Sequence, residues 1–275
     1  MTIRLDDDLA LARTLAAHAD LISMRRFTAQ DFTVTTKPDR TPVTEADRAA
    51  ELIILAALAR FAPGVPVIAD GDTGYGGLLN MRHTVQGYEQ AGAAAIQIED
   101  QEFPKKCGHT PNRRVIPMED MVRKIRVAVE ARASKDFLII ARTDARAVEG
   151  FEEALARAEA FIEAGADITF VEAPVSVEEL RRIPQALPVP QLVNIVIGGK
   201  TPTLDAAEFG RMGFGLVLYA NAALQGAVQG MNAALSQLRD TGRLDEDSGL
   251  VASFAQRQRL VQKDLLDGIA LSYKR

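Results

Sequence analysis

From Val65 onward, the chain alternates short apolar runs with longer stretches that have helical periodicity. The apolar runs have the length of strands and are apolar on both faces, which is typical of buried parallel strands. They cover residues 65–69, 93–98, 137–141, 167–171, 191–196 and 214–219. Amphipathic stretches lie between them, and Gly92, Gly165 and Gly213 fit the ends of crossover helices. The repeat predicts an α/β fold, either a β/α barrel or an open doubly wound sheet.

Polar residues favour one of these two architectures, because they come directly after the apolar runs. They are Asp70, Asp72, Glu99, Asp100, Arg142, Asp144, Glu172, Asn194 and Asn221. Side chains from so many strand ends converge only if the strands form a ring. We therefore predict a (β/α)8 TIM-barrel-like fold with its site at the C-terminal face of the barrel.

The N-terminal part of the chain does not follow this rhythm. Its patterns predict a helix, a short strand, a turn and a second helix, at residues 6–25, 32–36, 37–42 and 44–61. At most one strand is visible where an eight-stranded barrel needs two, so we expect the first two β/α units to be replaced. Ala62, Pro63 and Gly64 break the second helix. We place a boundary there, between an N-terminal segment of atypical origin (1–64) and a β/α barrel region with a helical tail (65–275).

Composition narrows the class of partner. The 275 residues carry a net charge of -5, with no Lys/Arg cluster interleaved with aromatic residues, so neither nucleic acid nor an anionic membrane is expected as a partner. The first eight residues are acidic where a signal peptide is basic, and there is no apolar run long enough to span a bilayer, so we expect a cytoplasmic protein that acts on a small molecule. The single cysteine, Cys107, excludes an intramolecular disulfide and a four-cysteine zinc site.

Carboxylates at two neighbouring strand ends are the candidate metal ligands. Asp70 and Asp72 flank a glycine after the first clear run, and Glu99 and Asp100 close the next one. Two carboxylates at this spacing suit a hard cation such as Mg²⁺, which keeps several waters and leaves positions for a substrate. The alternative for the first pair is an acidic, glycine-rich turn that caps the next helix. The second pair, brought to the same rim by the barrel, favours the metal.

The loop Lys105-Lys-Cys-Gly-His109 holds the candidate acid or base. A thiol serves in proton transfer when a nearby lysine or protonated histidine tunes its pKa, and Gly108 gives the loop the freedom to close over a bound acid. The alternative is a basic surface loop with an incidental cysteine. His18 and His83 lie in helical patterns and are expected to have no chemical role.

Three further strand-end residues are candidates for holding a substrate. The planar guanidinium of Arg142 suits bidentate capture of a carboxylate or enolate. Its alternative is a salt bridge with Asp144 or Glu172. Glu172 and Asn194 either position a carboxylate-bearing substrate or support the groups that do.

Taken together, these segments resemble the isocitrate lyase/phosphoenolpyruvate mutase superfamily, and within it the methylisocitrate lyase group. The motifs that carry the resemblance lie at residues 67–76, 96–101, 105–109, 141–144, 170–173 and 198–202. The resemblance covers the chain from about Val65 to its end and implies a Mg²⁺-dependent lyase that cleaves a carbon–carbon bond in a small 2-hydroxy or 2-oxo carboxylic acid. The superfamily also implies a homodimer or homotetramer, because the helical tail (250–273) resembles a segment that its members exchange between subunits.

The resemblance also implies roles for individual residues. Asp70 and Asp72 would bind Mg²⁺, and Glu99 would hold a metal-bound water. Cys107 would be the general acid that protonates the enolate-like product, helped by Lys105 and His109. The substrate would be held by Arg142, Gly108, Glu172 and Asn194.

The chain also departs from the superfamily pattern. A Tyr-x-Ser/Thr-Gly loop that normally precedes the Asp-x-Asp strand is missing, and Ile197 stands where many relatives carry an acidic residue. Residues 1–60 instead resemble the N-terminus of the inositol monophosphatase/histidinol phosphatase family, without the rest of that family's site, so phosphatase activity is not expected. Two alternatives to a working lyase stay open: a phosphonomutase of the same superfamily, and a catalytically impaired barrel that binds only metal and carboxylic acid.

Overall fold

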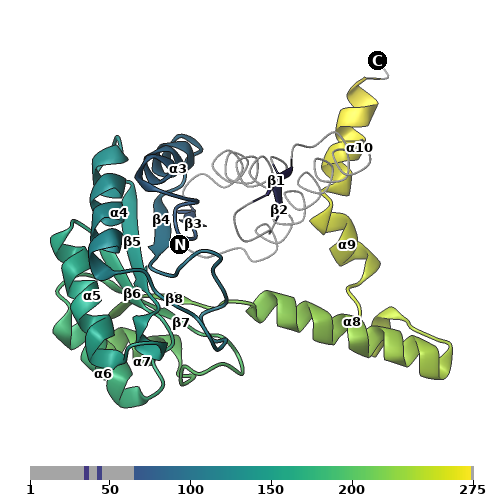
Figure 1. The fold of residues 1–275 in the computed structure, drawn as a ribbon. Helices are drawn as coiled ribbons and strands as arrows, with labels where there is room; N and C mark the ends of the chain where they lie inside the picture. The colour runs from purple at the N-terminus through teal and green to yellow at the C-terminus, as the bar shows by residue number, and fades with distance from the viewer. Residues whose placement is uncertain (1–33, 37–41, 45–64, 274–275) are drawn as a thin grey trace. The chain divides into compact units, whose positions relative to one another are not determined.

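The computed structural model describes residues 34–36, 42–44 and 65–273, and its main feature is a sheet of six parallel strands (Figure 1). The strands are β3 (Ile68–Asp70), β4 (Ala95–Glu99), β5 (Leu138–Thr143), β6 (Ile168–Val171), β7 (Gln191–Asn194) and β8 (Phe214–Leu218). Their order in the sheet is their order in the chain, and each neighbouring pair is parallel. A doubly wound sheet reverses direction at a switch point, whereas a barrel does not. The strand order therefore confirms the barrel-type winding.

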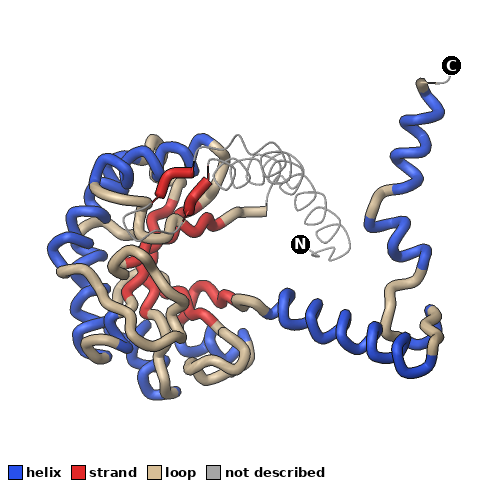
Figure 2. The backbone as a smooth tube through the Cα atoms, turned by 45° about the vertical axis from the view of Figure 1, so that its right-hand side comes forward, coloured by secondary structure: helices blue, strands red, loops and turns tan. Residues whose placement is uncertain are grey.

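One helix follows each of the first five of these strands. The helices are α3 (Leu78–Gln90), α4 (Met118–Ala131), α5 (Phe151–Glu163), α6 (Val177–Ala186) and α7 (Ala206–Met212), with a 3-10 turn, η1 (Ala145–Ala147), before α5. Figure 2 shows these helices, in blue, on the outer side of the strands. Gly92, Gly165 and Gly213 follow the ends of α3, α5 and α7 with φ of 91°, 103° and 107°. Because only glycine adopts this left-handed region freely, the predicted helix ends are confirmed.

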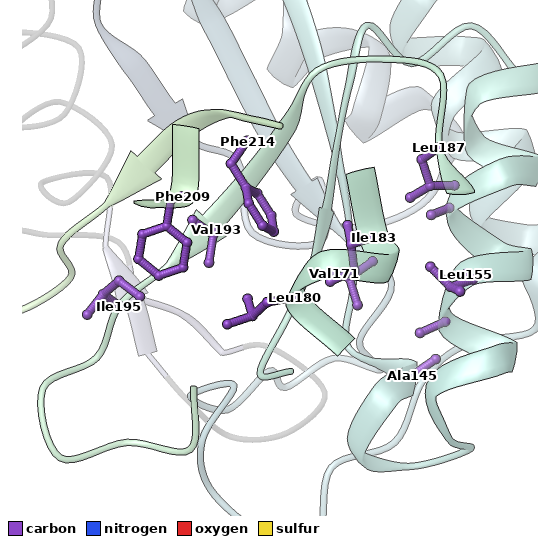
Figure 3. Packing of buried hydrophobic residues seen from close by; sticks show 12 residues of the cluster. Ala145, Leu155, Val171, Leu180, Ile183, Leu187, Val193, Ile195, Phe209 and Phe214 are labelled. Carbon is purple, nitrogen blue, oxygen red and sulfur yellow. The ribbon is translucent and has the colours of Figure 1, made fainter. Parts of the chain in front are cut away.

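The two faces of the sheet have separate apolar layers, because successive residues of a strand point to opposite sides. The outer layer lies between β6 to β8 and the helices, and Figure 3 shows Val171 and Val193 there beside Leu180 and Phe209. The inner layer contains Ala95, Ile140, Ile168, Phe170 and Leu192. Residues two positions further along these strands share the inner face. The carboxyl ends of β4 to β7 therefore place polar side chains on this face, namely Glu99, Arg142, Glu172 and Asn194.

The two edges of this sheet lack strand partners within the described part of the chain. There β3 pairs only with β4, and β8 pairs only with β7. Ile68 on β3 and Leu218 on β8 are each 42% exposed, although both belong to the inner-face set of their strands. The six strands thus form an incomplete ring, as predicted from the count of apolar runs.

Two short strands lie near the N-terminus, β1 (Val34–Thr36) and β2 (Pro42–Thr44), and they pair antiparallel. The predicted strand is confirmed over residues 34–36. The prediction that a helix begins at Thr44 is wrong at that residue, because Thr44 pairs with Val34 in β2. A strand of three residues is too short to show an alternating pattern in the sequence. The predicted helices at 6–25 and 45–61 lie outside the described residues.

The chain divides into two compact units, one with residues 33–44 and 64–220, and one with residues 221–275 and the remaining N-terminal residues. The described elements of the second unit are α8 (Ala222–Thr241), the 3-10 turn η2 (Glu246–Ser248), α9 (Phe254–Leu260) and α10 (Lys263–Ser272). The predicted helical tail is confirmed as two helices separated at Gln262, whose φ is 51°. Among the described helices, none combines the length and the hydropathy that a bilayer-spanning segment requires.

Candidate active site

The strand-end residues meet on the inner face of the sheet, as the ring geometry predicts. Glu99 on β4 is the register partner of Arg142 on β5, so the two side chains lie next to each other. Arg142 Nη1 lies 3.3 Å from Glu99 Oε2, and Arg142 Nη2 lies 3.8 Å from Glu172 Oε2. These three strands thus bring one guanidinium between two buried carboxylates.

Arg142 is held rigidly by its own strand and the next one. Its Nε and Nη2 donate to the two carboxylate oxygens of Asp144 at 2.8 and 3.0 Å, and its guanidinium lies 5.2 Å from the ring centroid of Phe170. Burial would lower the pKa of Arg142, but Asp144, Glu172 and Glu99 outweigh this effect and raise it. The salt bridge considered as an alternative role is therefore present, and it leaves Nη1 and Nη2 in reach of Glu99 and Glu172. The neighbouring carboxylates therefore fix both the charge and the orientation of the Arg142 guanidinium.

Glu99 is a buried carboxyl group whose oxygens lack hydrogen-bond donors among the described residues. Its side chain is fully buried, and neither of its oxygens accepts a hydrogen bond from the described residues. Burial raises the pKa of Glu99 to about 8, although Arg142 opposes the rise. A buried, unpartnered carboxylate is costly, and a nearby cation or ordered water would relieve that cost.

Asp70 and Asp72 already hold one cation in the structure, the ammonium of Lys105. Lys105 Nζ lies 2.5 Å from Asp72 Oδ1 and 3.7 Å from Asp70 Oδ2. Burial would lower the pKa of Lys105, but Glu99, Asp72 and Asp70 outweigh it and raise the pKa. The backbone N–H of Asp72 donates to Asp70 Oδ1 at 2.9 Å, which fixes the turn between the two carboxylates.

These groups fit a hydrated divalent cation better than a fully ligated one. Among the described residues, no three side chains of His, Cys, Asp or Glu are grouped closely enough to hold a metal ion by themselves. Mg²⁺ is commonly bound through one or two carboxylates and keeps several waters, so two aspartates beside a buried glutamate fit its preferences. The chemistry of Asp70, Asp72 and Glu99 therefore fits a divalent cation that keeps part of its water shell.

His109 joins the loop after β4 to the ends of β6 and β7. Its Nε2 lies 3.0 Å from Glu172 Oε1, and its Nδ1 accepts the backbone N–H of Lys200 at 3.0 Å. An Nδ1 that accepts a hydrogen bond leaves the proton of the neutral ring on Nε2, the nitrogen next to Glu172. The contact to Glu172 is close but does not have the angles of a hydrogen bond, so both Glu172 oxygens and His109 Nε2 are without a hydrogen-bond partner among the described residues.

Glu172 is charged in this setting. Burial would raise its pKa, but His109, Arg142 and the amide of Asn194 outweigh burial and lower it. Asn194 on β7 is buried, and its Oδ1 accepts no hydrogen bond from the described residues. Glu172 and Asn194 thus lie together, as predicted, with acceptor atoms left over for a ligand.

Two glycines allow the loops to approach this closely. A Cβ on Gly108 would lie 2.4 Å from Glu172 Cγ, and a Cβ on Gly199 would lie 2.6 Å from His109 Nδ1. Real Cβ atoms do not come this near to other atoms, so both positions require glycine. Gly108 therefore contributes by close backbone approach.

Cys107 is exposed on the same loop. Its backbone carbonyl accepts from Thr110 N and Oγ1 at 2.9 and 2.8 Å, which makes a tight turn. Gln101 exchanges two hydrogen bonds of 2.9 Å with the backbone of Lys106, so the start of the loop is also fixed. The structure brings Lys105 to the aspartates and His109 to Glu172, whereas Cys107, which lies between them in the sequence, is exposed.

Asp100 was expected at the metal rim, and this expectation is wrong. Its carboxylate accepts from Thr143 Oγ1 at 2.7 Å, from the backbone N–H of Asp144 at 2.8 Å and from Arg157 Nη1 at 3.3 Å. Burial raises the pKa of Asp100 to about 6 despite these donors. The physical reason is the strand period, because Asp100 follows Glu99 and points to the opposite side. Asn221, the other polar residue predicted after a strand end, is the N-cap residue of α8 and belongs to the other compact unit.

Sequence reasoning missed two cations that hold the site loops. Arg113 Nη1 donates to Asp144 Oδ1 at 2.7 Å and to the carbonyl of Gly108. Lys124 Nζ on α4 donates to the carbonyl of Thr73, next to Asp72, at 2.9 Å. Neither residue follows a strand, and adjacent basic residues such as Arg113 and Arg114 are typical of a solvated loop. Only the three-dimensional neighbours identify them.

Comparison with curated proteins gives relatives that bear lyase names. The chain is 49% identical to 2,3-dimethylmalate lyase of Eubacterium barkeri over 170 residues, which are 62% of this chain and 59% of that protein. It is 45% identical to 2-methylisocitrate lyase of Aeropyrum pernix over 197 residues, 70% of this chain and 63% of that protein. The chain thus spans about three fifths of the length of these curated relatives.

Solved structures agree on the fold. A crystal structure of 2,3-dimethylmalate lyase, described as a PEP mutase/isocitrate lyase superfamily member, matches with a TM-score of 0.73 at 35% identity, over 82% of this chain and 75% of that one. A phosphonopyruvate hydrolase in complex with oxalate and Mg²⁺ matches with a TM-score of 0.69 at 30% identity, over 82% of this chain and 79% of that one. The predicted TIM-barrel-like fold is confirmed by this likeness and by the parallel six-stranded sheet.

Family assignment rests on more than half of the sequence. The family model described as phosphoenolpyruvate phosphomutase matches residues 32–239. The predicted superfamily is confirmed, whereas the resemblance of residues 1–60 to inositol monophosphatases stays a prediction. This chain belongs to the phosphoenolpyruvate phosphomutase family, within the PEP mutase/isocitrate lyase superfamily.

Proposed function

We propose that this protein is a Mg²⁺-dependent lyase that cleaves a carbon–carbon bond in a small 2-hydroxy or 2-oxo carboxylic acid. The observation that carries the proposal is the inner-face group in which Arg142 lies between Glu99 and Glu172. One loop supplies a basic side chain on either side, with Lys105 against Asp72 and His109 against Glu172. Cations, carboxylates with free acceptor atoms and a nearby thiol are the groups that an enolate-forming cleavage needs. Relatives named as dimethylmalate and methylisocitrate lyases support the same reaction class.

Asp70 and Asp72 would hold the metal, and Glu99 would bind water in its coordination shell. When bound, Mg²⁺ supplies electrostatic stabilisation to the oxygens of a 2-oxo or 2-hydroxy carboxylate. The contact between Lys105 and the two aspartates means that the ammonium shares these carboxylates with the cation or moves towards the substrate.

The remaining steps belong to side chains of this chain. In a retro-aldol cleavage the hydroxyl oxygen would give up its proton to a base, for which the Glu172 carboxylate is available, and its carbon would become a carbonyl carbon. The electron pair of the broken carbon–carbon bond would stay on the carboxylate-bearing fragment. Arg142 and Lys105 would neutralise the charge that develops there, and Cys107 would donate its thiol proton to the carbon of the enolate. His109, held by Lys200 N–H and Glu172, would keep the loop and its thiol in place.

Substrate contacts are proposed for Arg142, Gly108, Glu172 and Asn194. The free acceptor atoms of Glu172 and Asn194 suit hydroxyl donors of a substrate, and Arg142 suits its carboxylate. Because the Tyr-x-Ser/Thr-Gly loop of the superfamily is missing, the identity of the acid is left to experiment.

The test is a panel of candidate acids with and without Mg²⁺. We expect Mg²⁺-dependent release of pyruvate from dimethylmalate or methylisocitrate, or of oxalate from oxaloacetate, and loss of that activity by at least about 100-fold in Cys107→Ser. Ser236→Ala on α8, in the other compact unit, is the control that keeps full activity. A panel without turnover by the parent protein would overturn the proposal; Mg²⁺-dependent oxalate binding by calorimetry in that case would assign the chain to the impaired, binding-only alternative.

A phosphonomutase is the second candidate. It is favoured by the family description and by a 38% identical relative from Arabidopsis thaliana named carboxyvinyl-carboxyphosphonate phosphorylmutase, which covers 83% of this chain. The presence of Cys107 and His109 favours the lyase, because transfer of a phosphoryl group needs no side chain that protonates a carbon atom at this position. Phosphorus NMR on phosphoenolpyruvate and phosphonopyruvate separates the two, because only a mutase interconverts them.

We propose two further properties with this function. The protein acts in the cytoplasm, in keeping with the absence of a bilayer-spanning helix among the described residues. It forms a homodimer or homotetramer through its C-terminal helices, as the resemblance implies.

A further inference from the structure

Arg113 is a buried cation that none of the proposed catalytic steps uses. Its side chain is 1% exposed, and the Asp144 carboxylate that it contacts is fully buried. A single nitrogen, Nη1, donates both to Asp144 Oδ1, at 2.7 Å, and to the backbone carbonyl of Gly108. Burying a guanidinium costs free energy, which charge-assisted hydrogen bonds of this kind offset.

Asp144 connects Arg113 to the substrate-binding cation. The same carboxylate accepts Arg142 Nε and Nη2 and Arg113 Nη1, so two guanidinium groups share one anion. The backbone N–H of Asp144 is in turn fixed by Asp100. Arg113 therefore links the position of Arg142 to the backbone between Cys107 and His109.

The loop between Gln101 and Val115 is closed at its base, and Arg113 contacts its middle. Its two ends are joined by the antiparallel bridge between Gln101 and Val115 and by the hydrogen bond from Glu102 N to Arg114 O, 2.9 Å long. Arg113 reaches from this stem to the middle of the loop, where Gly108 packs against Glu172. Without Arg113, the loop would keep the contacts of Gln101 and His109 but would lose the crosslink that joins Gly108 to Asp144.

We propose that Arg113 is a positioning residue that fixes the carbonyl of Gly108, and through it the Cys107 thiol, relative to Arg142. The expected effect of Arg113 on turnover rests on the proposed lyase function, whereas its expected effect on the order of the loop rests on the geometry alone. Arg113 touches no substrate; it sets the distance between the proton donor and the group that binds the carboxylate.

Two variants and a matched control test this role. Arg113→Met removes both hydrogen bonds at similar volume, and Arg113→Lys retains one nitrogen that is able to donate to both oxygens. Arg114→Met is the control, because Arg114 is the adjacent residue and its side chain is 79% exposed. Amide hydrogen exchange of loop residues 105–112 is the first readout, with the amides of β5 and α4 as an internal reference for global stability.

We expect the loop amides of Arg113→Met, including Thr110, to exchange at least about 10-fold faster than in the parent, while those of β5 and α4 change little. Arg113→Lys should restore most of the protection, and Arg114→Met should match the parent. Exchange in Arg113→Met that equals the parent's, or that rises equally in the loop, β5 and α4, would overturn the proposal. If Arg113→Met fails to fold, Arg113→Gln, which removes the charge but keeps a polar side chain, carries the same comparison, and parent-like loop exchange in that variant would overturn the proposal as well.

Kinetics supply the second readout. On the acid that the parent cleaves, Arg113→Met should lower kcat by about 100-fold and change KM by less than about threefold, because the misplaced thiol affects the chemical step. Arg113→Lys should recover at least about a tenth of the parent kcat. A rise in KM at unchanged kcat would overturn the positioning role. An inactive parent would count against the lyase function only, since the exchange experiment needs no turnover.

Discussion

At the scale of single residues, the site is defined by how buried charges compensate one another. Arg142 carries one positive charge among Asp144, Glu99 and Glu172, all of them buried. Their responses differ because their partners differ. At Glu99 burial outweighs Arg142 and the pKa rises to about 8, whereas at Glu172 the side chains of His109, Arg142 and Asn194 outweigh burial and the pKa falls. The two carboxyl groups therefore differ in how readily they lose their protons, although both lie beside the same guanidinium.

The lowered pKa of Glu172 predicts how stability depends on pH. A carboxyl group whose pKa is lower in the folded state stabilises the fold above its unfolded value, 4.5, and this stabilisation is lost as the pH falls through the folded value. We expect Glu172→Gln to lower the free energy of unfolding by about 1–3 kcal/mol at pH 7. The difference from the parent should shrink below pH 4.5. Urea unfolding at pH 7, 5 and 4 measures it.

The control for this prediction is Glu163→Gln, because Glu163 is exposed at the end of α5. It should change the unfolding free energy by less than about 0.5 kcal/mol at every pH. A constant difference between Glu172→Gln and the parent over the whole range would mean that the charge of Glu172 contributes nothing to the fold.

At the scale of elements, two loops from distant strands support each other. The loop after β4 supplies His109, and the loop after β7 supplies the N–H of Lys200 that fixes its ring. The close approach depends on Gly199. The contact between the two loops thus determines which ring nitrogen of neutral His109 carries the proton.

Gly199→Ala tests this contact. Its added Cβ would lie 2.6 Å from His109 Nδ1, so we expect the ring to move away from Lys200 and the neutral tautomer protonated on Nδ1 to become populated. Nitrogen-15 NMR of labelled histidines at high pH measures the tautomer ratio, and the three histidines of the chain make assignment by His109→Gln straightforward. Gly210→Ala is the control, because a Cβ there meets no atom within 4 Å. An unchanged His109 signal in Gly199→Ala would show that the loops do not depend on each other.

These two scales also show what was predictable from the sequence. The strands were predictable because short apolar runs repeat along the chain, with a helical stretch and often a glycine between one run and the next. Arg142, Glu172 and Asn194 were predictable because each lies at the end of such a run. Glu99 and Asp100 differ because consecutive residues at a strand end point to opposite faces, so only one of the two reaches the inner face. Arg113 was not predictable, because its contact with Asp144 joins residues 31 positions apart through a loop with no periodic pattern.

At the scale of the whole molecule, an apolar stripe on α8 is left without a cover. It consists of Leu224, Val228, Met231, Leu235 and Leu238, each between 44% and 64% exposed. The spacing alternates between four and three residues, which is the repeat that packs one helix against another. The helix has no buried residue. A long helix with such a stripe is stable in water when the stripe is covered, and a second copy of this chain is the cover that the predicted homodimer or homotetramer supplies.

Met231→Glu combined with Leu235→Glu places two carboxylates in this stripe and should dissociate the oligomer, because charges buried between two apolar helices lose their hydration. The matched control, Gln229→Glu with Ser236→Glu, adds the same charge on the opposite side of α8. Light scattering coupled to gel filtration at micromolar concentrations measures the mass: we expect an oligomer for the parent and the control, and a dissociation constant at least about 100-fold higher for the stripe variant. A monomeric parent, or a stripe variant of unchanged mass, would remove α8 as the subunit interface. Because the inner-face site lies entirely in residues 64–220, loss of the oligomer with retained oxalate binding would further show that α8 acts on assembly alone.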